Sequence, residues 1–129
     1  MKLNNLINRI KQINPNIKFV GKFDENNQKT GYWEFYWYNG NLRSKGNYIN
    51  GKKHGYWEFY YENGALFSKG NFINGMLNGH WVEYFENGKI NSKGYYQNGI
   101  EDGYWVEYFV NGKIYSKGNY INGEYNEIK

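Results

Sequence analysis

The sequence contains no cysteine, one proline and two histidines in 129 residues. Without cysteine, the chain has no disulfide framework, no thiolate zinc site and no thiol nucleophile. Because His54 and His80 are the only histidines, histidine-rich metal clusters and most histidine-based acid–base catalysis are excluded too. Aliphatic residues are also scarce, since the 15 Tyr, 8 Phe and 5 Trp outnumber Ala, Val, Ile, Leu and Met combined. We therefore predict strands and tight turns, which suit the 17 glycines, rather than an aliphatic core.

Long apolar runs are missing as well. No stretch approaches the ~20 apolar residues that a membrane-spanning helix needs. Residues 1–14 have no unbroken apolar run and no small-residue cleavage site, so we expect no secretory signal and a cytoplasmic protein. The net charge of +4 is only mildly basic, and nucleic acid is not an expected partner.

A unit of 24 residues occurs four times without insertion or deletion. Each unit opens with Gly-x-Trp and continues with Asn-Gly, Ser-Lys-Gly and a second Asn-Gly. Residues 17–30 read as the second half of an earlier, degenerate copy. The repeat array therefore spans 17–126, followed by a tail at 127–129. Its full units are 31–54, 55–78, 79–102 and 103–126, named here the first to fourth units.

Each unit predicts a β-hairpin, because Asn-Gly favours the two-residue type I′ turn between strands. We place that turn at the first Asn-Gly and a longer connection, with three variable residues, after the second. The fold class is then all-β, an elongated antiparallel meander of about nine or ten strands. Counting from a two-residue turn gives the pairs Trp33–Gly46, Phe35–Ser44, Trp37–Leu42, Glu34–Lys45, Tyr36–Arg43, Trp57–Gly70, Phe59–Ser68, Tyr61–Leu66 and Glu58–Lys69.

The N-terminal segment 1–16 predicts a short amphipathic helix. Its apolar residues recur at helical spacing, and the helix should end before Pro15. Such a helix can cover the open edge of the sheet. The spaced residues are Leu3, Leu6, Ile7, Ile10 and Ile13.

The unit pattern, G-[YH]-W followed by N-G, S-K-G and N-G, resembles the MORN repeat. It is most similar to the variant of bacterial proteins of the YwqK antitoxin-component family. The resemblance covers residues 31–126 and implies an elongated hairpin array with a protein-binding or membrane-associated role. It implies no catalytic residues and no cofactor. An antitoxin role is what the name of this variant implies.

Two surfaces are candidate partner sites. The variable triplets after the second Asn-Gly are expected at loop tips along one long side, where apolar residues indicate a contact surface. A column of tyrosines beside lysines is expected on the sheet face opposite the tryptophans. Val82 and Val106 stand across from two of these lysines and leave them without an acidic partner. The predicted partner-binding residues are Lys52, Lys53, Met76, Leu77, Ile100, Glu101, Tyr36, Tyr60, Tyr84, Tyr108, Lys93 and Lys117.

The tryptophans themselves allow two interpretations. Trp33, Trp57, Trp81 and Trp105 could form a stacking platform for sugar rings, or the buried layer of the sheet. We expect a non-enzymatic, monomeric protein that binds and inhibits a larger protein by steric obstruction. An antitoxin, or a phage or mobile-element inhibitor of a host defence nuclease, would fit. A glycan-binding aromatic repeat and a membrane-associated scaffold are the alternatives.

Overall fold

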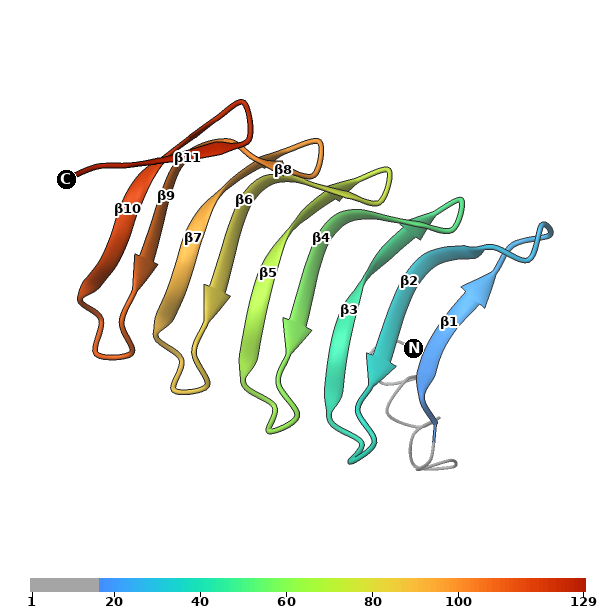
Figure 1. Cartoon of the computed structure of the whole chain (residues 1–129). Helices are drawn as coiled ribbons and strands as arrows, with labels where there is room; N and C mark the ends of the chain where they lie inside the picture. Colours follow the sequence, from blue (N-terminus) through green and yellow to red (C-terminus); the bar gives the residue numbers. More distant parts are fainter. Residues whose placement is uncertain (1–16) are drawn as a thin grey trace.

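The computed structural model describes residues 17–129 as one open antiparallel sheet (Figure 1). Strands follow one another in chain order, and the short β8 pairs with β7 beside β9. The predicted elongated meander is confirmed, with eleven strands rather than nine or ten. The predicted helix at 1–16 lies outside the described residues. The strands are β1 (Phe19–Phe23), β2 (Lys29–Tyr36), β3 (Leu42–Ile49), β4 (Lys52–Tyr60), β5 (Leu66–Ile73), β6 (Met76–Tyr84), β7 (Ile90–Gln97), β8 (Ile100–Glu101), β9 (Gly103–Tyr108), β10 (Ile114–Ile121) and β11 (Glu124–Glu127).

The second Asn-Gly of each unit forms the two-residue turn. Asn50 and Gly51 both have positive φ, 51° and 78°, as a type I′ turn requires. Ile49 pairs directly with Lys52 across this turn. The prediction of a longer connection here is wrong, because the three variable residues continue the next strand. Lys52 therefore begins β4, as Met76 begins β6.

The first Asn-Gly belongs to a three-residue loop, where we predicted the two-residue turn. The Gly40 N–H donates to the Trp37 carbonyl at 2.9 Å, and the Trp37 N–H donates to the Asn41 carbonyl at 2.7 Å. This is a type I turn followed by a glycine with positive φ, which makes a β-bulge. The Asn39 side chain accepts the Asn41 N–H at 2.9 Å and so stabilises this conformation over type I′.

A separate bulge within the following strand shifts the register near each three-residue loop. The predicted pairs that involve Trp33, Glu34 and Phe35 are confirmed, as are their equivalents from Trp57 to Phe59. The pairs Trp37–Leu42, Tyr36–Arg43 and Tyr61–Leu66 are wrong. Tyr36 pairs with Leu42, and Tyr60 pairs with Leu66. Arg43 is the extra residue of the bulge.

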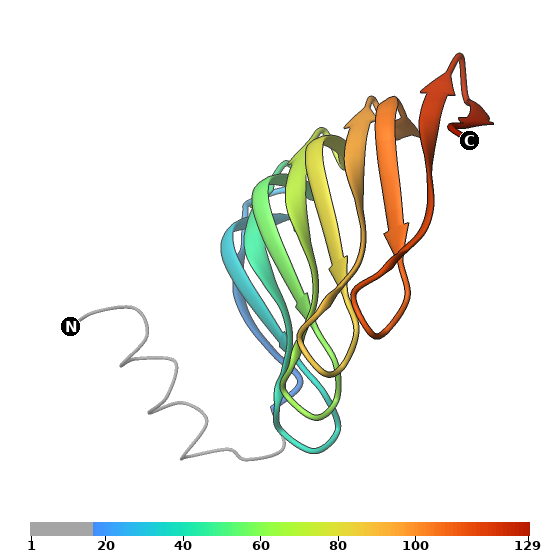
Figure 2. The same cartoon turned by 90° about the vertical axis from the view of Figure 1, so that its left-hand side faces the viewer.

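A second irregularity bends the sheet where each unit begins. Lys45 pairs with Glu58 and Asn47 pairs with His54, so Gly46 alone faces the three residues 55–57. Gly55 has a φ of 78°, which only glycine adopts readily. The equivalent glycines, at 31, 79 and 103, also have positive φ. Extra residues bend a strand, and the long strands are visibly curved (Figure 2).

The bend brings each tryptophan over a glycine of the preceding unit. A Cβ on Gly46 would overlap the indole of Trp57, and Gly70 and Gly94 are covered in the same way by Trp81 and Trp105. We predicted that each indole covers the glycine paired with it within its own hairpin. That placement is wrong, because each indole lies against the glycine of the other neighbouring strand, which for Trp81 is also its direct partner Gly70.

The indoles form one aromatic layer with the rings between them. Trp33 and Trp57 are 0% exposed, and Trp81 and Trp105 are 7% and 8% exposed. Tyr48 lies edge-on between two indoles, with ring centroids 5.9 Å from Trp33 and 5.1 Å from Trp57. Phe72, Tyr96 and Tyr120 continue this layer toward the C-terminus. The interpretation of the tryptophans as the packed layer of the sheet is confirmed.

Both ends of the array repeat this contact in modified form. At the N-terminal end Trp33 covers Gly21, and the turn at 24–28 is one residue longer than a type I′ turn. Gly21 stands one position earlier in the partial unit than Gly46 does in the first unit, and the extra turn residue compensates for this difference. At the C-terminal end the ring of Tyr125 contacts Gly118 in place of an indole.

Candidate functional site

The tryptophan layer offers no open ring faces for a ligand. Three of its indole N–H groups donate to the carbonyl that follows the covered glycine, as Trp57 Nε1 does to Asn47 at 3.0 Å. Trp81 Nε1 instead donates to Glu83 Oε1 at 3.1 Å. Stacking of sugar rings requires an exposed face. The glycan-binding alternative therefore loses the four rings on which it depended.

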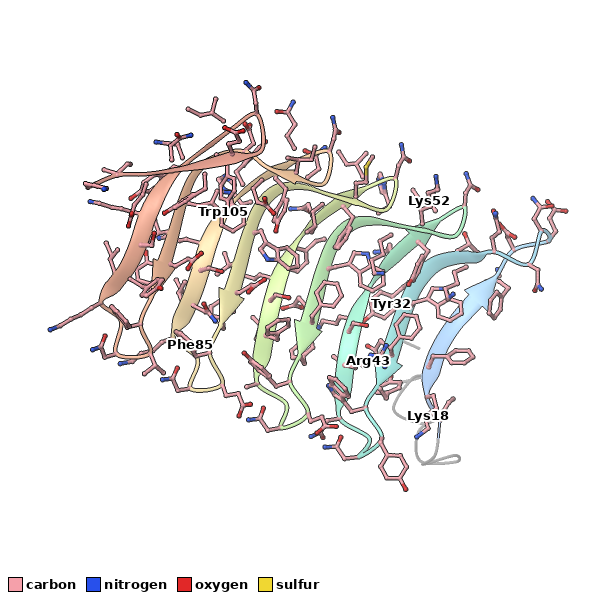
Figure 3. The ribbon with its side chains drawn as sticks, in the orientation of Figure 1. Lys18, Tyr32, Arg43, Lys52, Phe85 and Trp105 are labelled. Atoms are coloured by element: carbon pink, nitrogen blue, oxygen red, sulfur yellow. The ribbon has the colours of Figure 1, made fainter. Side chains whose placement is uncertain are left out.

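Successive residues of each variable triplet lie on opposite sides of their strand. Met76 and Ile100 are 46% and 58% exposed at the edge formed by the type I′ turns, where Lys52 also lies (Figure 3). Leu77 instead packs against the aromatic core. The ammonium of Lys53 lies 5.3 Å from the Trp57 ring centroid. The predicted contact row therefore separates into an exposed edge and an inward set that includes Glu101, which is partly buried.

The other side of the sheet is the Tyr/Lys face, with Tyr36, Tyr60, Tyr84 and Tyr108 beside Lys45, Lys69, Lys93 and Lys117. The predicted proximity of tyrosine rings and lysine ammonium groups is confirmed for two pairs. Lys69 Nζ lies 5.8 Å from the Tyr84 ring centroid, and Lys93 Nζ lies 5.9 Å from that of Tyr108.

In the first two units, acidic residues occupy this face. Glu34 accepts hydrogen bonds from the hydroxyls of Tyr32, at 2.6 Å, and Tyr36. Burial, followed by the Glu34 carboxylate, raises the pKa of both tyrosines above the ordinary value. Lys45 Nζ lies 3.4 Å from Glu58 of the second unit. The polar groups of this half are therefore satisfied within the sheet.

In the last two units, valines replace those glutamates. Val82 and Val106 both pair with Lys93, one from each neighbouring strand. The predicted pairs Val82–Lys93 and Val106–Lys117 are confirmed. The second valine beside Lys93 was not predicted, and Lys93 has no acidic residue directly beside it on either strand. Val106 is 4% exposed, whereas Tyr95 and Tyr104 nearby are 39% and 51% exposed.

These residues line a groove of about 630 Å³, the valine groove. The ring of His80 meets that of Tyr95 edge-on with centroids 5.2 Å apart. The sequence prediction found the valines and the unpaired lysine but left out the two tyrosines and His80. The available signal was Tyr95, which stands where the other full units have asparagine. The side chains that line the groove include His80, Val82, Lys93, Tyr95, Asp102, Tyr104 and Val106.

Within residues 17–129, no group of three or more His, Asp or Glu side chains is placed to hold a metal ion. That same part of the chain contains no helix long and apolar enough to cross a membrane.

Comparison with known proteins gives a family match and two distant structures. A family model described as a MORN repeat variant matches residues 29–50, 53–74, 77–98 and 101–122, more than half of the 129 residues. No curated protein matches. The first of two TarM structures, from S. aureus, is a TarM variant in complex with fondaparinux, α-GlcNAc-glycerol and UDP, and aligns with a TM-score of 0.49 at 11% identity. The second TarM structure aligns with a TM-score of 0.48 at 11% identity. The match covers 98% of this chain but spans only 24% of either structure.

Proposed function

The chain belongs to the MORN repeat variant family, and we propose that it is a non-enzymatic module that binds another protein through the valine groove. The supporting observation is the change from Glu34 and Glu58 to Val82 and Val106 at equivalent positions. The repeat folds with either residue type, so the valines are not required by the sheet. They create an apolar surface on a face that is polar in the first two units.

The groove has the chemistry of an interface centre. Centres of protein interfaces are depleted in charge and enriched in tyrosine, and their strongest contacts are apolar or aromatic anchors in pockets. Tyr95, Tyr104 and the two valines supply the apolar wall. Lys93 supplies one cation beside it. The partner is therefore a protein with an apolar side chain that enters the groove and a carboxylate that reaches Lys93.

The exposed edge gives a second contact for the same partner. Met76 begins β6 and Ile100 begins β8, the strands that lead into the third and fourth units, whose residues line the valine groove. A partner that covered both would contact one end of a continuous hydrogen-bonded sheet. Steric obstruction of the partner's own site is then the mechanism of inhibition, as expected of an antitoxin-like protein. We propose that it acts as a monomer in the cytoplasm.

The double variant Val82→Glu/Val106→Glu tests the groove, because it restores the residue type of the first two units. We expect it to fold and to weaken binding of a partner captured from the source cells by about tenfold or more. Calorimetry with the purified partner measures this. Lys45→Ala, on the same face of the first unit, is the control and should bind normally. Unchanged affinity of the double variant would exclude the groove.

The inhibitory role has its own test. The activity of the purified partner should fall on stoichiometric addition of this protein. It should recover when the double variant replaces the wild type. A partner that stays fully active in the saturated complex would mean that the protein binds without inhibiting.

A further inference from the structure

A second groove lies on the opposite side of the sheet, between the first and second units. It encloses about 280 Å³ beside the aromatic layer. Three cations line it, and each comes from a different strand: Lys29 from β2, Arg43 from β3 and Lys53 from β4. This cationic groove is lined by Lys29, Phe35, Arg43, Ser44, Tyr48, Lys53 and Phe59.

The two ammonium groups converge on one ring. Lys29 Nζ and Lys53 Nζ lie 5.6 Å and 5.9 Å from the Tyr48 ring centroid. Arg43 lies 5.5 Å from the Trp37 ring centroid, at the same end of the array. Phe35 and Phe59 are partly exposed and supply flat walls. Cations are thus held over aromatic rings, where part of their hydration is lost.

No acidic residue compensates these charges. None of the three cations forms an ion pair within residues 17–129, where Lys45–Glu58 is the one pair and lies on the Tyr/Lys face. The groove lining contains no Asp or Glu in the same part of the chain. Burial, with a smaller contribution from the nearby Lys29 charge, lowers the pKa of Lys53. The groove therefore keeps like charges together at an energetic cost.

The repeat shows that the fold does not require these cations. The positions of Lys29 and Lys53 become Leu77 and Glu101 in the later units, and that of Arg43 becomes Phe67 and then Asn91. The strand pairing at these positions persists, from Tyr48–Lys53 to Phe72–Leu77 and Tyr96–Glu101. The cations are thus a specific property of the N-terminal half.

We propose that the cationic groove binds a phosphate group, either free or carried by a small organic molecule such as a mononucleotide. A phosphate group carries about −1.5 to −2 charges at pH 7 and so matches several cations better than one carboxylate does. Arginine and lysine are its usual protein partners. The volume lies just below the ~300–1,000 Å³ of small-molecule sites, which suits a phosphate with at most one planar base against Phe35 and Phe59.

Calorimetric titration of the full chain with inorganic phosphate, pyrophosphate, AMP and adenosine tests this proposal. We expect saturable binding of the phosphate compounds and none of adenosine. Binding of AMP should weaken from about pH 7.5 to about pH 5.5, because a phosphate ester loses its second charge near pH 6. AMP that binds more tightly than inorganic phosphate indicates an organic carrier, and equal affinities indicate the free anion.

Variants that copy the later units locate the site. Lys29→Leu/Lys53→Leu places leucine at both positions, as the second unit has at the equivalent Leu77. This double variant should weaken phosphate binding at least about tenfold. Lys52→Leu, the adjacent residue on the other side of the strand, is the matched control and should bind normally. If the double variant unfolds, Arg43→Asn, which copies Asn91, replaces it. The proposal is overturned by unsaturable binding, by wild-type affinity in the groove variants, or by an acidic peptide that binds where phosphate does not.

Discussion

At the scale of single residues, tyrosine hydroxyls dominate the polar chemistry of the sheet. Glu34 accepts two of them, and burial is the first cause of their raised pKa values. Burial also raises the pKa of Tyr96 to about 12, with smaller contributions from Glu101 and Glu83. The same direction holds for all the tyrosines with a resolved shift, which are Tyr32, Tyr36, Tyr48, Tyr56, Tyr60, Tyr61, Tyr96 and Tyr120.

These shifts predict that the protein loses stability in alkali. A raised pKa in the folded state means that the unfolded chain ionises first, so the stabilisation is complete below about pH 10 and is lost as the pH rises toward the folded values. The lowered pKa of Lys53 has the opposite effect and raises the stability as the pH rises, but it is one group against eight tyrosines. Urea unfolding between about pH 8 and 11 measures the free energy of unfolding. Tyr60→Phe should reduce the slope, and a flat profile would contradict the prediction.

At the scale of elements, the contact between successive units is a glycine covered by an indole. It joins β4 to β3 through Trp57 and Gly46, and each later pair of units in the same way. The indole N–H also donates to the carbonyl that follows the covered glycine, as in the bond from Trp105 to Tyr95 at 3.1 Å, and this carbonyl accepts the Asp102 N–H at 2.8 Å as well. One side chain thus fills the bulge and adds a hydrogen bond to it.

Gly46→Ala should therefore destabilise the protein strongly. Its Cβ would overlap Trp57, and overpacking of this kind costs about 3 kcal/mol. Gly55→Ala is the matched control, because its φ is 78° but nothing lies within 4 Å of the added Cβ. We expect that variant to lose only about 1 kcal/mol. Urea unfolding of both variants distinguishes the two costs, and equal losses would refute the role of the indole.

At the scale of the whole molecule, the sheet is a linear array in which each unit contacts only its neighbours. The strand order β1 to β7 and then β9 to β11 has no crossover. The stability of such arrays is approximately a sum of unit and interface contributions. Function therefore depends on which units carry which substitutions, with the cationic groove at one end and the valine groove at the other.

Deletion of residues 55–78 tests this organisation, because it removes one whole unit and lets Trp81 cover Gly46. The shortened chain should fold, with a lower free energy of unfolding and a smaller m-value, since less surface is buried. Urea unfolding followed by circular dichroism measures both. Deletion of 55–66, half a unit, should prevent cooperative folding because it joins strands in the wrong phase. A folded half-unit deletion would contradict the array.

Much of this architecture follows from the repeat alone. The period, the all-β class and the open meander required only counting and turn propensity. The pairing of Trp33 with Gly46 was also predicted, although from a two-residue turn; the extra loop residue and the bulge at Arg43 offset each other. The lysine between two valines was predictable because cross-strand neighbours follow from the register. The helix proposed for 1–16 and the identity of a partner remain predictions.

The tertiary structure decided which Asn-Gly makes which turn. Both turns contain the same Asn-Gly dipeptide, so local propensity cannot distinguish them. The Asn39 bond to Asn41 and the bend at Gly55 distinguish them. Because the second Asn-Gly makes the two-residue turn, the variable triplets lie in strands rather than in loops. Each indole lies over a glycine of the preceding unit. The two grooves also depend on contacts between units, because each is lined by residues from neighbouring units. Sequence thus determined the repeating unit, and contacts between units determined how its side chains meet.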